Sequence, residues 1–191
     1  MREVDQTLAG KLLVAAPQLA DPNFARTVIM LLQHHEEGAL GVVLNRPTSA
    51  TVAEALPDWE ALAGTLPVLF QGGPVSVDGA LCLASLQGLD QPPGWQGLEL
   101  PELAGIGIVD LDSTPVMVAT RVDRLRIFAG YAGWGPGQLE TEIQSGGWYV
   151  LSPEARDPFT SRPTDLWRDV LRRQGGQLAT LSTMPDEISL N

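Results

Sequence analysis

The alternation of apolar and polar residues along the chain predicts a protein built mainly from strands. Short runs rich in valine, isoleucine and leucine, bounded by glycine, proline or charged residues, are typical of buried strands. The segments that fit this description are 11–17, 27–33, 39–45, 65–71, 80–85, 105–110, 115–121, 125–130 and 148–152. The second and third of these segments are joined by the polar residues 34–38, which predicts a β-hairpin.

Other segments show the three- and four-residue spacing of an amphipathic helix. In residues 51–64, Thr51 and Glu54 have the spacing of a capping box, and Pro57 is expected to kink or split the helix. A second helix is predicted from about 136 to 145, where a pair of glycines follows it.

Glycine- and proline-rich segments separate these elements. Residues 72–79, GGPVSVDG, predict a turn, and residues 86–103 have no clear period and predict a long surface connection. Runs of strands with a few helices, rather than strict alternation, predict an α+β or mixed α/β fold. We expect a single compact domain over residues 1–191, with a mixed or open barrel-like sheet at its core and helices packed outside.

Composition agrees with one domain in a reducing compartment. The chain has 191 residues, of which 44% are hydrophobic, and its single cysteine, Cys82, has apolar neighbours that predict a buried core residue rather than a reactive thiol. The N-terminus lacks the apolar region of a signal peptide, and the run 28–32 is far shorter than the ~20 residues of a membrane span. We therefore expect a cytoplasmic protein with no membrane partner.

The charge argues against nucleic acid as a direct partner. Asp and Glu number 23 against 12 Lys and Arg, a formal net charge of −11. A third helix, 164–174, carries the main basic cluster, in which Asp169 can pair with Arg172 and Arg173 along an exposed face. That spacing favours a solvated helix face over a DNA-binding stripe. The apolar positions predicted to face inward are Leu166, Trp167, Val170 and Leu171.

The segment 128–143, FAGYAGWGPGQLETEI, places four glycines around Trp134 before a predicted helix. Glycines at a helix N-terminus allow backbone N–H groups to converge on an anion. The segment lacks the lysine and hydroxyl residue of a P-loop, and its glycine spacing is not that of a dinucleotide-binding loop. Two interpretations stay open: a ligand cradle, or a structural corner that lets Trp134 fold back onto the core.

Arg46 is the second candidate for anion binding. It follows the end of a predicted strand, where its guanidinium could hold a carboxylate or phosphate through two parallel hydrogen bonds, or form a plain surface ion pair. The candidate ligand-binding residues are Asn45, Arg46, Gly130, Tyr131, Gly133, Trp134, Gly135 and Gly137.

Catalytic and metal-binding motifs are not evident. His34 and His35 are the only histidines, and neighbours on an extended segment point to opposite faces, so we expect a solvated connection and no metal or cofactor. The chain has no G-x-S-x-G elbow, and catalytic residues remain unassigned. Two carboxylate pairs are acid–base candidates by residue type alone and are equally surface pairs: Asp110 with Asp112, and Glu140 with Glu142.

Three blocks, residues 12–47, 69–83 and 128–143, together resemble the AlgH/YqgE family of bacterial proteins. The resemblance implies a compact cytoplasmic α/β domain whose biochemical function is not established, with a regulator label connected with alginate production in one branch. The ending LSTMPDEISLN, residues 181–191, departs from that family, so no role tied to it is carried over. Residues in the family's blocks are Asp21, Pro22, Asn45, Arg46, Pro47, Gly72, Gly73, Pro74, Gly130, Tyr131, Gly133, Trp134, Gly135 and Gly137.

Three functional hypotheses follow. The leading one is a non-catalytic regulatory or adaptor protein that binds an unidentified protein partner or a small anionic ligand. The alternative is a hydrolase or transferase of an anionic metabolite that uses the 130–137 glycine loop and Arg46. The third, a transcriptional regulator, is disfavoured by the net charge.

Overall fold

Ten strands of one sheet account for most of the apolar runs, and the computed structural model describes them within residues 7–100 and 102–185. The strands are β1 (Leu12–Ala15), β2 (Val28–His35), β3 (Gly38–Val43), β4 (Pro47–Thr51), β5 (Val68–Gln71), β6 (Val75–Leu86), β7 (Trp95–Gly97), β8 (Ile106–Val109), β9 (Val122–Trp134) and β10 (Trp148–Leu151). The predicted hairpin is confirmed, although its two strands extend to His35 and Gly38 and leave a shorter connection.

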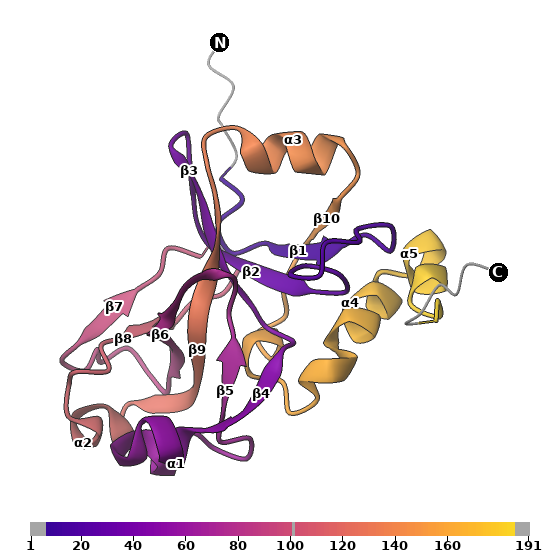
Figure 1. The fold of residues 1–191 in the computed structure, drawn as a ribbon. Helices are drawn as coiled ribbons and strands as arrows, with labels where there is room; N and C mark the ends of the chain where they lie inside the picture. The colour runs from indigo at the N-terminus through magenta and orange to yellow at the C-terminus, as the bar shows by residue number, and fades with distance from the viewer. Residues whose placement is uncertain (1–6, 101, 186–191) are drawn as a thin grey trace.

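Helices lie outside this sheet, at its two ends and along one side (Figure 1). They are α1 (Val52–Ala55), η1 (Pro57–Leu62), α2 (Pro115–Ala119), α3 (Gln138–Gln144), η2 (Asp157–Phe159), η3 (Pro163–Asp165), α4 (Leu166–Gln174) and α5 (Gly176–Leu181). Among the described residues, no helix is long and apolar enough to cross a membrane.

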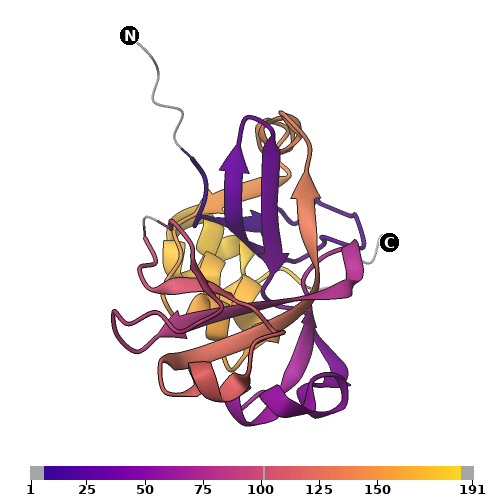
Figure 2. The ribbon, with the colours of Figure 1, turned by 90° about the vertical axis from the view of Figure 1, so that its left-hand side faces the viewer.

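The sheet curls because the long strand β9 takes part in both halves (Figure 2). Its last residues pair with β3, whereas most of its length pairs with β6. The strand order is β10-β1-β2-β3-β9-β6-β8-β7, and β5 adds to β9 as a parallel neighbour. The predicted α+β fold with an open barrel-like sheet is confirmed.

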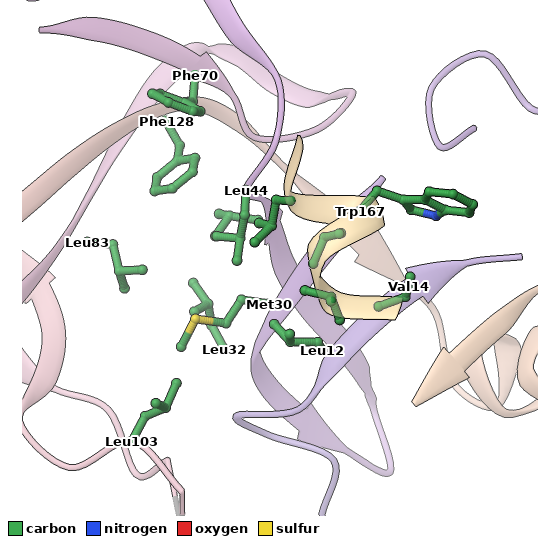
Figure 3. Packing of buried hydrophobic residues seen from close by; sticks show 14 of the residues in the cluster. Leu12, Val14, Met30, Leu32, Leu44, Phe70, Leu83, Leu103, Phe128 and Trp167 are labelled. Atoms are coloured by element: carbon green, nitrogen blue, oxygen red, sulfur yellow. The ribbon is translucent and has the colours of Figure 1, made fainter. Parts of the chain in front are cut away.

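The inner face of the sheet is closed by α4 (Figure 3). The four predicted inward positions of this helix are all buried, and the Trp167 indole Nε1 donates a hydrogen bond of 2.9 Å to the Ala15 carbonyl. Burial of these side chains removes apolar surface from water and is the main force that holds the helix on the sheet. Cys82 is fully buried, as predicted.

The capping box and the proline break in residues 51–64 are also confirmed. The Thr51 side chain accepts a hydrogen bond from the Glu54 N–H, and the Glu54 carboxylate accepts one from the Thr51 N–H. The α-helix ends before Pro57, where a 3₁₀ helix follows.

The strand predicted over 115–121 is wrong, because these residues form helix α2. Pro115 has no N–H to donate to a neighbouring strand, but it fits the first turn of a helix. Val116 and Met117 are 69% and 48% exposed, so the apolar run that suggested a buried strand is mostly solvated.

Two predicted connections contain strand structure. Strand β6 begins at Val75, inside the predicted turn 72–79, and β7 lies inside the predicted connection 86–103 and pairs with β8. Val75 pairs with Tyr131, which is remote in sequence, so the local pattern does not reveal this pairing. Strand β7 pairs with the next strand along the chain, but its three residues are too few to show a period. Of the divergent ending 181–191, residues 186–191 lie outside the described residues.

Candidate functional site

Residues 130–134 of the predicted glycine loop belong to strand β9, where Gly130 lies against the backbone of the segment that leads into β6. Gly130 has a φ of +70°, and a Cβ at this position would lie 2.6 Å from the Gly73 carbonyl oxygen. A Cβ at Gly73 would lie 2.1 Å from the Tyr131 carbonyl carbon. Side chains cannot fit at such distances, so Gly73 and Gly130 allow the segment between β5 and β6 to lie in backbone contact with β9.

The other glycines of the segment have more room. A Cβ at Gly133 or Gly135 would meet no atom closer than 3.5 Å, and one at Gly137 would meet none within 4 Å. Gly137 has a φ of +71° and precedes the first residue of α3, while the Gly135 N–H donates a hydrogen bond of 3.1 Å to the Gln138 side chain. Gly135 and Gly137 form the corner that leads into α3, whereas Gly133 belongs to β9.

Asn45 bridges two backbone groups next to the start of β2. Its Nδ2 donates to the Arg26 carbonyl at 2.8 Å, and its Oδ1 accepts from the Val28 N–H at 2.9 Å. Arg26 has a φ of +59°, a backbone conformation that non-glycine residues rarely adopt. The Asn45 side chain therefore helps to hold a strained backbone in place.

The Arg46 side chain binds the backbone of the same segment. Its Nη2 donates to the carbonyl oxygens of Pro22 and Ala25 at 3.0 and 3.2 Å. Burial lowers the pKa of Arg46, and the nearby Asp21 carboxylate opposes that shift. The guanidinium thus has a structural role in fixing the turn before β2.

Trp134 folds back onto the core, as the corner interpretation expects. Its ring stacks on Phe24 with the centroids 6.3 Å apart and meets Trp148 edge-on at 6.2 Å. The Glu142 Oε2 accepts hydrogen bonds from both indoles, at 3.0 Å from Trp134 Nε1 and 2.8 Å from Trp148 Nε1. Glu142 is therefore a structural carboxylate that ties α3 to β9 and β10.

His34 is engaged through both ring nitrogens, and Cys82 is buried. His34 lies in β2 rather than in a solvated connection; its Nδ1 accepts from the Leu8 N–H at 3.1 Å, and its Nε2 lies 2.7 Å from the Glu140 carboxylate. Burial raises the pKa of the Cys82 thiol to about 12. Within residues 7–100 and 102–185, no three His, Cys, Asp or Glu side chains gather so as to hold a metal ion.

A basic cavity of about 550 Å³, here called the arginine pocket, lies beside α4. Strand β9, the connection between β10 and α4, and α4 itself contribute its walls. Five arginines line it, together with the carboxylates of Asp157 and Asp169. These arginines are Arg124, Arg156, Arg162, Arg172 and Arg173.

An ion pair between Arg173 and Asp157 holds two walls of the arginine pocket together. The Arg173 guanidinium donates through both terminal nitrogens to Asp157, at 2.8 and 2.7 Å, and the Asp157 residue is only 1% exposed. The Asp157 Oδ2 also accepts from the Glu154 N–H at 2.7 Å. This bidentate pair joins α4 to the connection that precedes it.

A buried arginine supports the residues of that connection that follow Asp157. The Arg126 guanidinium donates to the carbonyls of Pro158 and Thr160 at 3.2 and 2.7 Å, and its carbon lies 4.2 Å from the centre of the Phe70 ring. Burial lowers the pKa of Arg126 to about 10. Arg126 is thus a positioning residue for the wall of the arginine pocket.

The sequence interpretation of this region needs correction. Asp169 pairs with Arg172 as predicted, but Arg173 pairs with Asp157, and the charged face of α4 lines a cavity instead of facing only solvent. The signal available in the sequence was the concentration of five of the 12 basic residues between positions 156 and 173. Arg124 is remote in sequence, and only the fold brings it to the pocket.

Comparison with known proteins agrees with the predicted resemblance. A family model described as AlgH-like matches residues 12–179. A UPF0301 protein of Streptomyces coelicolor is 54% identical over 195 residues, covering 100% of this chain and 98% of the relative.

Solved structures agree as well. The chain is similar to a crystal structure from Corynebacterium diphtheriae, with a TM-score of 0.84, 31% identity, and coverage of 96% of this chain and 95% of that one. It is also similar to the solution structure of the AlgH protein from Pseudomonas aeruginosa, with a TM-score of 0.67, 29% identity, and coverage of 97% and 98%. Because these matches span nearly the whole chain, the protein belongs to the AlgH-like family.

Proposed function

We propose that this protein is a non-catalytic regulatory or adaptor protein that acts by binding a small anionic ligand in the arginine pocket. The observation that carries the proposal is the gathering of five arginines around one cavity of about 550 Å³ in a chain of net charge −11. Small-molecule sites measure roughly 300–1,000 Å³. Arginine binds carboxylates and phosphates through paired hydrogen bonds, so the pocket has both the size and the chemistry for such a ligand.

The environment of the usual reactive groups supports a non-catalytic role. A thiol with a pKa of about 12 carries almost no thiolate at neutral pH, so Cys82 is poorly suited to act as a nucleophile. Both ring nitrogens of His34 are engaged by neighbouring groups. The proposal places the protein in the cytoplasm, because a chain with a single cysteine suits a reducing compartment.

Anion binding to the purified protein tests this function. The probes are inorganic phosphate, pyrophosphate, citrate and AMP, measured by thermal shift and calorimetry at low ionic strength. A ligand at a hundred times its Kd stabilises the folded state by about 2.7 kcal/mol. We expect at least one probe to raise Tm, and Arg172→Ala to remove most of the increase.

Arg121→Ala is the matched control, because it removes the same charge from an exposed residue that does not line the pocket. It should keep the response of the parent protein. The proposal is wrong if no probe raises Tm, or if the control loses as much of the response as Arg172→Ala. Turnover of a probe that disappears on a single substitution would contradict its non-catalytic part.

A further inference from the structure

One carboxylate of the chain already occupies the arginine pocket. Asp169 Oδ2 accepts a hydrogen bond from Arg162 Nη2 at 2.9 Å, and Asp169 Oδ1 accepts one from Arg172 Nη1 at 3.1 Å. The two arginines come from different elements, since Arg162 precedes η3 and Arg172 lies in the last turn of α4. Asp169 thus marks a position where an anionic group is held from two sides.

This internal ion pair is easily replaced. The side chains of Arg162 and Arg172 are 67% and 62% exposed, and exposed ion pairs contribute little to stability. An anion that binds the two guanidiniums more strongly than Asp169 can therefore take its place. A ligand carboxylate would only replace an equivalent group, so its binding would gain little free energy.

Two further arginines of the pocket, Arg124 and Arg156, offer hydrogen-bond donors to a larger anion, although each also pairs with a carboxylate. Arg124 and Arg156 make their closest contacts to carboxylates through Nε, at 3.0 Å to Asp123 and 2.8 Å to Glu154. Their terminal nitrogens lie outside these closest contacts and remain as donors for a larger anion. The buried Arg126 supports the wall of the pocket. Its two hydrogen bonds go to uncharged carbonyl oxygens, which do not neutralise its positive charge.

The size and lining of the pocket favour a ligand larger than a free ion. Its volume of about 550 Å³ suits a small organic molecule. Phe159 and Leu166 add apolar surface to the lining, and the Arg124 guanidinium lies 5.8 Å from the centre of the Phe159 ring. A ligand with both an anionic group and a carbon skeleton would use both kinds of surface.

Resting on the proposed function, we propose that the arginine pocket binds the phosphate group of a phosphorylated small molecule, which displaces Asp169 from Arg162 and Arg172. A phosphate monoester carries about −1.5 to −2 charges at pH 7 and three acceptor oxygens. It therefore attracts the two guanidiniums more strongly than the aspartate does and has an oxygen left for a third arginine. The carbon skeleton lies against Phe159 and Leu166.

Calorimetry with AMP as the probe tests the displacement of Asp169. Asp169→Asn removes the competing negative charge, so we expect the Kd for AMP to fall about five-fold, the size expected for one exposed ion pair. Asp112→Asn neutralises an exposed carboxylate outside the pocket and should leave the Kd unchanged. Arg162→Ala and Arg172→Ala should each raise it by about ten-fold or more.

Two further probes separate this inference from the proposed function. Adenosine lacks the phosphate and should not bind, and citrate should bind more weakly than AMP. If citrate binds through Arg172 as tightly as AMP, or if Asp169→Asn weakens AMP binding or leaves it unchanged, the pocket is an anion site but the phosphate inference is wrong. If no probe binds the parent protein, both proposals are wrong.

The unaltered protein gives a readout that does not depend on the folding of a variant. In ¹H–¹⁵N spectra, the Nε–H signals of Arg162 and Arg172 should move on titration with AMP and should not move with adenosine. Unmoved signals at concentrations of AMP that saturate binding would overturn the inference.

Discussion

Glycine residues in the AlgH-like blocks serve two different physical purposes. At Gly130, a left-handed φ of +70° coincides with backbone oxygens that lie too close for any side chain. At Gly137, φ is nearly the same, +71°, but the space is open. The two positions therefore separate the effect of the dihedral angle from the effect of close approach.

Substituting alanine at each position measures that difference. Gly137→Ala should lower the free energy of unfolding by about 1 kcal/mol, because only the left-handed backbone is unfavourable. Gly130→Ala should lower it by about 3 kcal/mol, because the added methyl group also clashes with the carbonyl oxygens of Gly73 and Val75. Urea denaturation of both variants checks the prediction, and equal losses would contradict the assigned close approach.

At the scale of elements, the position of α3 on the sheet depends on the Glu142 carboxylate. Glu142 accepts hydrogen bonds from an indole on β9 and an indole at the start of β10, while the same helix begins at the corner formed by Gly137. The short helix has only seven residues, so tertiary contacts rather than helix propensity must hold it in place.

Removal of this acceptor should loosen the helix. Glu142→Ala leaves two partly buried indole N–H groups without their acceptor and should lower the free energy of unfolding by about 2–3 kcal/mol. Glu142→Gln keeps a carbonyl oxygen at the same distance along the side chain and should retain most of the stability. Guanidinium denaturation followed by tryptophan fluorescence compares the two, and an alanine variant as stable as the glutamine variant would refute the assignment.

At the scale of the whole molecule, the C-terminal third completes a core that the preceding residues begin. Strand β10 pairs with β1, so that Leu12 lies opposite Leu151, and α4 buries Leu166 and Trp167 against the sheet. The helix α5 buries none of its residues. The contribution of α4 to the core is therefore much larger than that of α5.

Two truncations test this difference. A chain that ends at residue 146 lacks β10 and α4 and should show no cooperative thermal transition, because the inner face of the sheet is exposed to water. A chain that ends at residue 175 lacks only α5 and the residues after it, and should unfold cooperatively at a lower Tm. Scanning calorimetry distinguishes the outcomes, and a cooperative transition in the shorter chain would show that α4 is not part of the cooperative core.

The local sequence by itself determined the elements whose signals are local. The apolar spacing of α4, the Thr51–Glu54 capping box and the break at Pro57 act through contacts within a few residues, so the local pattern predicts them. The local pattern wrongly predicts a strand at residues 115–121, because a run rich in valine is typical of a buried strand, whereas Pro115 occupies the first turn of a helix. The separate blocks of the AlgH-like resemblance were also readable without a structure.

Only the tertiary structure decided what the glycines and arginines do. Gly73 and Gly130 are 57 positions apart, and their need to be glycine arises from a close backbone approach that exists only in the folded sheet. Asn45 and Arg46 could hold a ligand by residue type, yet their side chains hold the turn before β2. The arginine pocket brings Arg124 next to the charged residues beside α4. The hydrophobic periodicity of the sequence does not predict this contact, because it depends on how the sheet curls.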